Sequence, residues 1–234
     1  MAGSIPTPGA WQPATVVAIR DETTTAKTFR LALTAPSVHL AGQHYVVRLT
    51  APDGYTAARS YSIASAPDGT AEIELTVERL EDGEVSAFLH DEVVQGDQLE
   101  VRGPIGGWFV WRGDHPALLV GGGSGVVPLM AMLRLARQSG QPGVRLVVSV
   151  RSPADLYYAD ELPGPDASII YTREAPPSVP VAHLTSGDLV GALLPDATAY
   201  VCGSARFADA ASELVLAAGV PPDRVRVERF GPTG

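Results

Sequence analysis

Near its middle the chain reads Leu118-Leu119-Val120-Gly121-Gly122-Gly123-Ser124-Gly125-Val126-Val127-Pro128. A short apolar run ends at consecutive glycines and is followed by apolar residues at helical spacing, which predicts a buried strand, a tight loop and a helix N-terminus. Glycines let the backbone approach an anion closely, and the first amide groups of a helix point toward it. The stretch therefore predicts a phosphate-binding loop.

The residues beyond this loop have the rhythm of a parallel sheet. Short apolar runs alternate with segments of helical period, as in βαβ units. Strands are expected at 117–120, 144–150, 168–171, 199–202 and 224–228, and helices at 126–138, 187–193 and 205–218. Residues 113–234 are therefore predicted to form a Rossmann-like, five-stranded parallel α/β nucleotide-binding domain.

The residues before the loop have the pattern of antiparallel strands. Residues 1–13 contain three prolines and little periodicity, so a loose N-terminal segment is expected there. Short alternating runs predict strands at 14–20, 27–33, 44–49, 59–65, 71–78, 98–102 and 108–111, with a helix at 85–93. Six or more short strands with one helix predict that residues 1–112 form a small antiparallel β-barrel, which makes the fold class β + α/β.

The bulk composition excludes several classes of protein. The chain has 234 residues, a formal net charge of −9 and 45% apolar residues, as in an ordinary soluble protein. Nucleic-acid and anionic-membrane binders need a basic surface, so neither partner is expected. The sequence shows no signal peptide and no apolar run of membrane-spanning length, so we expect a cytoplasmic protein. We also expect a monomer.

The cysteine and histidine content limits the chemistry. A single cysteine, Cys202, excludes an internal disulfide, a Cys-rich zinc site and an iron–sulfur cluster held by four thiolates. The five histidines lack metal-ligand spacing, so no metal site is expected. Any redox chemistry must come from a cofactor that is held in another way.

The glycine loop departs from the dinucleotide fingerprint. Val126 stands where G-x-G-x-x-G requires a glycine or alanine, and the next expected strand ends in Arg151-Ser152 instead of an acid. A cation and a hydroxyl at that place suit a 2′-phosphate, which favours NADPH over NADH. Arg173, after the third strand, supplies a second cation. A lone arginine is more often a solvated surface charge, but consecutive strand ends on the ligand side strengthen the binding interpretation.

Two further segments could contact a cofactor. Arg59-Ser60-Tyr61-Ser62 offers a cation, an aromatic ring and hydroxyls on one expected strand, although a half-exposed structural strand fits the same periodicity better. Gly83-Glu84-Val85-Ser86 precedes the expected helix 85–93, and Ser86 is a natural N-cap. A helix start of this kind can receive a phosphate, but capping is the commoner role.

Six motifs together resemble the ferredoxin-NADP reductase superfamily. In order along nearly the whole chain they are Arg59-x-Tyr61-Ser62, Gly83-x-Val85-Ser86, Gly103-Pro104-Ile105-Gly106, Gly121 to Gly125 with Pro128, Cys202-Gly203-Ser204 and Glu228-Arg229-Phe230. The resemblance implies a six-stranded antiparallel barrel that carries FAD, with FMN less favoured, and a second domain that binds the nicotinamide cofactor.

The resemblance also implies roles around the flavin. It places Arg59 at the diphosphate, Tyr61 on the isoalloxazine ring and Ser62 near the reactive N5. The other flavin-binding residues that it implies are Ser60, Thr76, Val77, Gly83, Val85 and Ser86.

A second set of residues is implied at the nicotinamide cofactor. Gly123, Ser124 and Gly125 would lie at its diphosphate, and Cys202 with Gly203 would approach the nicotinamide. Arg151, Ser152 and Arg173 fall where NADPH-selective members hold the 2′-phosphate. A further arginine that such members often carry is missing from the segment 181–185. A buried strand end is the alternative role of Cys202.

The C-terminal residues complete the implied site. Many members place an aromatic ring over the flavin, and Phe230 is the candidate here, with four residues after it. Glu228 would lie beside the nicotinamide as a polar partner, or alternatively be a surface carboxylate. The residues expected to act in catalysis are Ser62, Cys202, Glu228 and Phe230.

The expected function is a reductase that takes a hydride from NADPH, or NADH, onto FAD and passes single electrons to a separate protein. A ferredoxin or an oxygenase component is the expected acceptor, because the chain lacks the cysteines of an attached iron–sulfur domain. Two alternatives stay open. One is a diaphorase or flavin reductase that uses small acceptors, and the other is a flavin-binding electron-transfer subunit that acts only within a larger complex.

Overall fold

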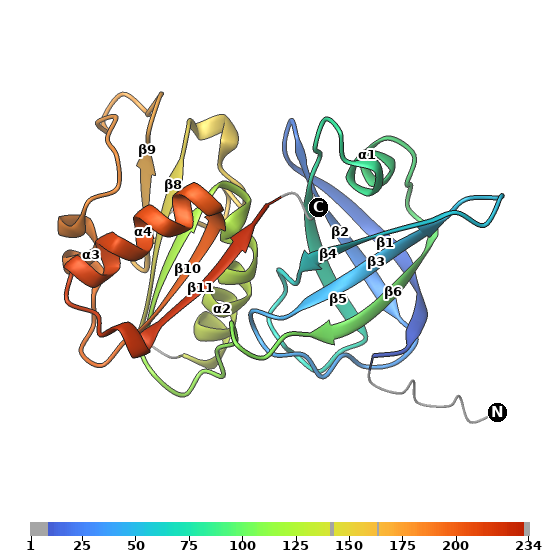
Figure 1. Cartoon of the computed structure of the whole chain (residues 1–234), viewed down its shortest axis with the longest axis horizontal. Helices are drawn as coiled ribbons and strands as arrows, with labels where there is room; N and C mark the ends of the chain where they lie inside the picture. Colours follow the sequence, from blue (N-terminus) through green and yellow to red (C-terminus); the bar gives the residue numbers. More distant parts are fainter. Residues whose placement is uncertain (1–8, 141–142, 163, 232–234) are drawn as a thin grey trace.

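The computed structural model describes residues 9–140, 143–162 and 164–231. Two sheets stand side by side, and residues 106–116 connect them (Figure 1). The expected boundary between residues 112 and 113 lies in this connection and stays a prediction. No helix among the described residues has the length and apolar character that a bilayer crossing requires.

The N-terminal half forms one six-stranded antiparallel sheet with the order β4-β3-β6-β1-β2-β5. Its strands are β1 (Trp11–Thr23), β2 (Ala26–Leu33), β3 (His44–Thr50), β4 (Thr56–Ser62), β5 (Glu72–Glu78) and β6 (Gln98–Ile105), and helix α1 (Glu84–Asp91) lies between β5 and β6. Alternate residues of these strands, such as Phe29, Leu75 and Val101, fill a common apolar core. The pattern of period two therefore predicts the sheet correctly.

The barrel is only partly closed. Strands β4 and β5 are the two edges of the sheet, and among the described residues the single bridge Ile63–Leu75 joins them. The backbone bond from Ala64 N to Glu74 O, 2.8 Å long, supports this junction. Beyond it the described residues of the two edge strands have no ladder pairing, so the expected barrel is present but open along this side.

Two predicted segments of this half differ in the structure. Residues 108–111 form no strand, and only Trp111 makes an isolated bridge, with Ala41. The apolar signal of this segment has another cause, because Phe109 and Trp111 are buried in the core cluster of the second domain. The expected loose segment 1–13 is also too long, since β1 begins at Trp11; residues 1–8 lie outside the described residues.

The C-terminal half forms a five-stranded parallel sheet with the order β11-β10-β7-β8-β9. Its strands are β7 (Ala117–Gly122), β8 (Val144–Val150), β9 (Ala167–Tyr171), β10 (Thr198–Ser204) and β11 (Val225–Phe230). The helices are α2 (Val126–Ser139), α3 (Ser186–Ala192) and α4 (Ala205–Ala217), with short 3-10 turns at η1 (Gly123–Gly125), η2 (Pro153–Asp155) and η3 (Pro222–Arg224). The expected doubly wound α/β fold is confirmed.

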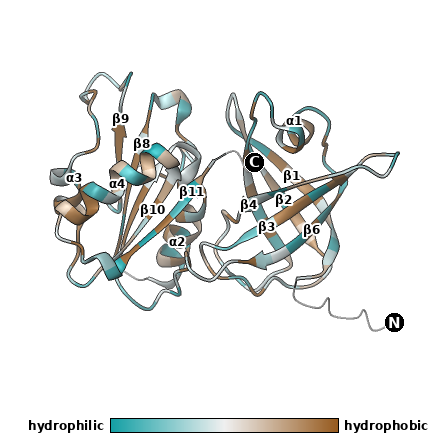
Figure 2. Ribbon diagram, viewed as in Figure 1, coloured by the Kyte–Doolittle hydropathy of each residue, from teal (hydrophilic) through white to brown (hydrophobic). Residues whose placement is uncertain are grey.

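The two faces of this sheet are covered by different helices. Leu119, Leu146 and Cys202 pack in one cluster with α2, whereas Leu118, Val147 and Val201 pack in another with α3 and α4. Figure 2 shows apolar colour along the buried strands, and polar and apolar colours alternating on α4. A sheet buried on both faces explains the continuous apolar runs in its sequence.

Candidate functional site

The gap between β4 and β5 is the first candidate site, and we call it the seam. Continuing the antiparallel register of the Ile63–Leu75 bridge sets Ser62 opposite Thr76 and Tyr61 opposite Val77. These four residues are the ones that the sequence proposes for the flavin ring. The backbone groups of two unpaired strand edges can hydrogen-bond a planar heterocycle there.

The side chains at the seam differ in exposure. Ser62 and Thr76 are buried, and Tyr61 is half-buried, which raises the pKa of its phenol. Arg59 and Ser60 lie exposed on the same strand, and Arg59 Nη1 donates to Ala58 O at 2.8 Å. The exposed guanidinium retains other donors for an anion.

Helix α1 packs against both strands that flank the seam. Gly83 is its N-cap, with no side-chain capping bond, so the expectation that Ser86 caps the helix is wrong. Ser86 lies inside the first turn, where its Oγ donates to Gly83 O at 3.2 Å and accepts from Leu80 N at 3.2 Å. Buried Val85 fixes this turn on the barrel, and within the described residues no N-cap side chain accepts from the amide groups of the helix start.

These features fit FAD. The seam offers two strand edges, and next to it stand a helix start without a side-chain cap and an exposed arginine. A helix N-terminus and an arginine are both suited to a diphosphate. Each role stays a prediction for Arg59, Ser60, Tyr61, Ser62, Thr76, Val77, Gly83, Val85 and Ser86.

The glycine loop is the second candidate site. Residues 123–125 form the turn η1 directly before α2, and Gly123 has a left-handed φ of 53°. A Cβ atom on Gly125 would lie 2.1 Å from Cys202 O, so this loop packs directly on strand β10. The close approach explains the requirement for glycine and brings Ser124 next to the Cys202-Gly203 strand end.

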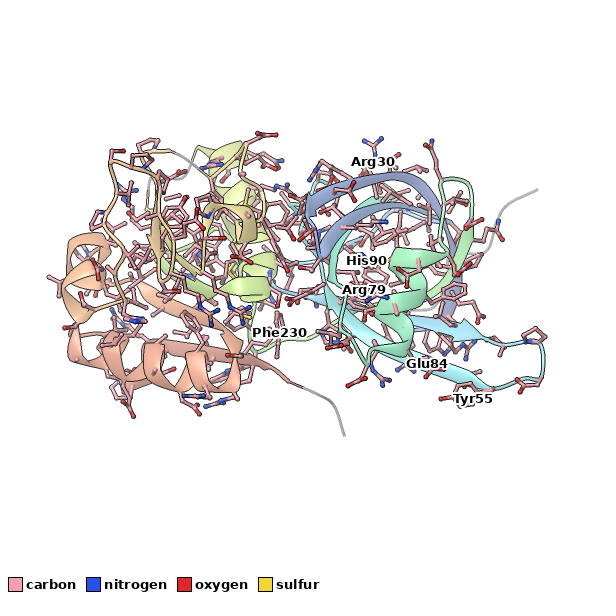
Figure 3. The ribbon with its side chains drawn as sticks, turned by 90° about the horizontal axis from the view of Figure 1, so that it is seen from above. Arg30, Tyr55, Arg79, Glu84, His90 and Phe230 are labelled. Carbon is pink, nitrogen blue, oxygen red and sulfur yellow. The ribbon has the colours of Figure 1, made fainter. Side chains whose placement is uncertain are left out.

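Cys202 lies beside this loop, and Glu228 and Phe230 belong to the neighbouring strand β11. Cys202 and Glu228 are register partners in the β10–β11 ladder, and Phe230 packs against the apolar cluster that contains Cys202. Burial raises the pKa of the Cys202 thiol well above its ordinary value, and neighbouring Glu228 adds to the effect. Glu228 is half-buried, and burial raises the pKa of its carboxyl to about 7; the roles of Cys202, Glu228 and Phe230 stay predictions. Figure 3 shows Phe230 at the boundary between the two domains.

Arg151, Ser152 and Arg173 come together at neighbouring strand ends, after β8 and β9. Arg173 N donates to Arg151 O at 2.9 Å, and both arginines are exposed. Ser152 Oγ donates to Asp155 Oδ2 at 2.6 Å, so its hydrogen is already engaged. Glu174 N also donates to Arg151 O, at 3.0 Å. Glu174 is therefore a second acidic residue, after Asp155, that belongs to the loops carrying the two arginines.

Polar residues at the domain boundary were not anticipated from the sequence. Arg134 on α2 donates to Ala64 O at 2.9 Å and to Glu74 Oε2 at 2.8 Å, and Tyr158 donates to Thr76 Oγ1 at 2.6 Å. The sequence holds a signal for one of them, because Arg134 directly follows the apolar helix run 126–133, all of which is buried. A charge directly after such a run indicates a specific partner.

Comparison with known proteins agrees with these features. Residues 13–110 match the family described as oxidoreductase FAD-binding domain. A ferredoxin–NAD(P)+ reductase component of naphthalene 1,2-dioxygenase/salicylate 5-hydroxylase systems from Ralstonia is 30% identical over 233 residues, covering 94% of this chain and 69% of that protein. A flavohemoprotein of Pseudomonas putida is 33% identical, and the match covers 82% of this chain and 51% of that protein.

The fold has a close counterpart among solved structures. The flavohem-like FAD/NAD-binding domain of nitric oxide dioxygenase from Vibrio cholerae superposes with a TM-score of 0.84 at 25% identity, covering 94% of this chain and 99% of that domain. Together with the identity over most of the Ralstonia reductase, this shows that the chain belongs to the ferredoxin reductase-like family of FAD-binding, NAD(P)H-dependent oxidoreductases.

Proposed function

We propose that this protein takes a hydride from NADPH, in preference to NADH, and passes electrons singly to a separate protein acceptor. One observation carries the proposal: Ala64, directly beyond the seam, shares an apolar cluster with Cys202, and Phe230 packs on it. The candidate flavin and nicotinamide residues therefore border one continuous apolar cluster that crosses the domain boundary. Bound FAD supplies the conversion of a two-electron donor into single-electron transfers.

The chain's own residues position the two cofactors and balance the charge of their diphosphates. Arg59 and the start of α1 neutralise the flavin diphosphate, and the close packing of Gly125 on Cys202 lets the nucleotide diphosphate approach the backbone. Glu228 holds a proton on its carboxyl below pH 7 and releases it above, which makes it a polar partner beside the nicotinamide.

The preference for NADPH rests on the two arginines after β8 and β9. Exposed Arg151 and Arg173 lie on adjoining loops joined by a backbone hydrogen bond, and paired cations are suited to a 2′-phosphate. Asp155 and Glu174 oppose this preference, because a carboxylate suits the free 2′-hydroxyl of NADH. We give the arginines more weight because Asp155 already accepts a bond from Ser152.

The test is anaerobic. Purified, FAD-loaded protein is mixed with NADPH or with NADH, and loss of the flavin absorbance is followed. Bleaching with both and faster with NADPH supports the proposal, faster bleaching with NADH overturns the donor preference, and no bleaching with either rejects the reductase function. The reduced protein is then offered a ferredoxin, an oxygenase component or a small dye as acceptor.

The relatives favour a protein acceptor, since the Ralstonia protein is named as a reductase component of oxygenase systems. A second candidate function is an electron-transfer module within a larger protein or complex. The flavohemoprotein match supports it, because this chain spans 51% of that relative. Dye reduction by the isolated chain with no transfer to any ferredoxin would favour this second function or a diaphorase.

A further inference from the structure

A closed circuit of hydrogen bonds joins the two domains, and we call it the Tyr158 circuit. Tyr158 OH donates to Thr76 Oγ1 at 2.6 Å, and Tyr158 N donates to Glu22 Oε2 at 2.9 Å. Thr28 Oγ1 donates to Glu22 Oε1 at 2.6 Å and lies 2.7 Å from Thr76 Oγ1. Four residues from β1, β2, β5 and the segment after η2 therefore form one ring.

The direction of each bond follows from the number of hydrogens. Thr28 has one hydroxyl hydrogen and gives it to Glu22, so Thr76 must donate to Thr28. The Thr76 oxygen then accepts from Tyr158, and both ends of the circuit finish on the Glu22 carboxylate. Removing one hydroxyl breaks the ring, because each member depends on the next.

The circuit is buried and holds a strained backbone. Tyr158 and Thr28 are each 2% exposed, Thr76 is 5% exposed and the Glu22 side chain is 5% exposed. Tyr158 has a φ of 56°, a left-handed conformation that costs a non-glycine residue about 1–2 kcal/mol. Such strain persists where the surroundings fix the residue, and it is concentrated at functional sites.

The circuit reaches strand β5, at the border of the seam, from the side that faces the second domain. Leu75 and Val77 point into the barrel core, so Thr76 between them faces the second domain, where Tyr158 meets it. Thr76 is also the seam residue opposite Ser62 in the register of the Ile63–Leu75 bridge. Tyr158 thus connects the nucleotide-binding domain to the strand that flanks the candidate flavin site.

We propose that Tyr158 is a positioning residue for hydride transfer, which holds Thr76 and the β5 side of the seam in place against the nucleotide-binding domain. The inference rests on the proposed function. It adds a role for a residue that belongs to neither candidate diphosphate loop. A displacement of reacting groups by about 1 Å costs about a hundredfold in rate, so the loss of one buried bond is measurable.

The test compares two neighbouring tyrosines. Tyr158→Phe removes only the hydroxyl that reaches Thr76, while the backbone bond to Glu22 remains. Tyr157→Phe is the control, because Tyr157 is 4% exposed and its hydroxyl makes no hydrogen bond within the described residues. Two quantities are measured: the affinity of the FAD-free protein for FAD by quenching of FAD fluorescence, and the bleaching rate at increasing NADPH.

For Tyr158→Phe we expect FAD to bind about fivefold more weakly and the saturating bleaching rate to fall about tenfold. The NADPH concentration at half-maximal rate stays within about twofold, and Tyr157→Phe stays within about twofold of the parent protein in every quantity. Unchanged FAD affinity and unchanged rate in Tyr158→Phe would overturn the inference. So would a lower melting temperature with an unchanged saturating rate, because that result assigns Tyr158 a structural role alone.

A double-mutant cycle gives an independent check. Thr76→Val keeps the shape of the side chain and removes the hydroxyl, and it is expected to reproduce the effect of Tyr158→Phe. The double variant should be no worse than the more severe single variant, and fully additive losses contradict the circuit. If the parent protein bleaches with neither NADPH nor NADH, the proposed function fails, while the FAD affinities still decide whether Tyr158 acts on the seam.

Discussion

Arg134 and Glu74 join the helix that follows the glycine loop to the strand that borders the seam, with Arg134 Nη1 lying 2.8 Å from Glu74 Oε2. Arg134 also donates to Ala64 O at 2.9 Å and pairs with Glu161. One guanidinium therefore binds both chain segments next to the Ile63–Leu75 bridge. The position of α2 and the closure of the barrel are coupled through this residue.

Replacing Arg134 by Met tests this coupling. The Arg134 side chain is 13% exposed, so its removal takes the nearest cation from the partly buried Glu74 and Glu161 carboxylates and leaves Glu74 only the longer contact with Arg20, at 4.0 Å. We expect the free energy of unfolding to fall by about 2–4 kcal/mol in urea denaturation. Arg137→Met is the control: Arg137 lies on the same helix as Arg134, is more exposed and pairs with Asp166 before β9, and its loss should cost about 1 kcal/mol. Equal losses would show that the link across the boundary adds nothing.

Glu228 makes stability depend on pH. Its pKa in the folded protein is about 7, against 4.5 for an ordinary glutamate. Between these values the folded protein holds a proton that the unfolded chain has lost, so the free energy of unfolding decreases as pH rises. The thermal stability of Glu228→Gln relative to the parent should therefore be greater at pH 8.5 than at pH 5.5. Glu213→Gln, at an exposed position on α4, is the comparison, and a pH-independent difference for Glu228→Gln would contradict its burial.

Arg173 tests the choice of donor. If its guanidinium binds a 2′-phosphate, Arg173→Ala raises the KM for NADPH about tenfold, the effect of losing about 1.4 kcal/mol, and leaves the KM for NADH within about twofold. Arg30→Ala, on the barrel strand β2 and labelled in Figure 3, controls for the loss of a surface cation. An equal rise of KM for both nucleotides would exclude a phosphate-specific role.

Gly125 tests the packing of the glycine loop. A methyl group there would overlap the carbonyl of Cys202, so Gly125→Ala must push the loop away from β10. We expect a loss of about 3 kcal/mol or more, comparable to other overpacking in a core, together with weaker NADPH binding. Gly191→Ala in α3 meets nothing within 4 Å and is expected to be neutral or to stabilise by up to about 1 kcal/mol. Melting temperatures and NADPH titrations distinguish the two variants.

Local patterns predicted most of this fold, and contacts between distant segments explain what they missed. Strand β8 occurs at residues 144–150 as expected, because a parallel strand buried on both faces produces a continuous apolar run. The strand expected at 108–111 is absent because Phe109 and Trp111 are apolar for a tertiary reason, packing at the domain boundary.

The candidate site also combines features that local sequence patterns predicted with contacts that they could not predict. Arg151 and Arg173 were expected at neighbouring strand ends, and a backbone bond joins the loops that carry them, although their role stays a prediction. The bond between Tyr158 and Thr76 spans 82 positions and leaves no periodic trace in the sequence. Ser86 was misassigned because a serine near a helix start resembles a cap, whereas the helix begins two residues earlier, at Glu84.

The single bridge that joins the described edge strands, between Ile63 and Leu75, also affects the solubility of the newly synthesised protein. Before FAD is taken up, the two strand margins are templates to which a strand from another copy can add. We expect riboflavin-starved cells to yield a larger fraction of aggregated, insoluble protein than cells supplied with riboflavin. Supplying the vitamin during synthesis would keep the chains apart.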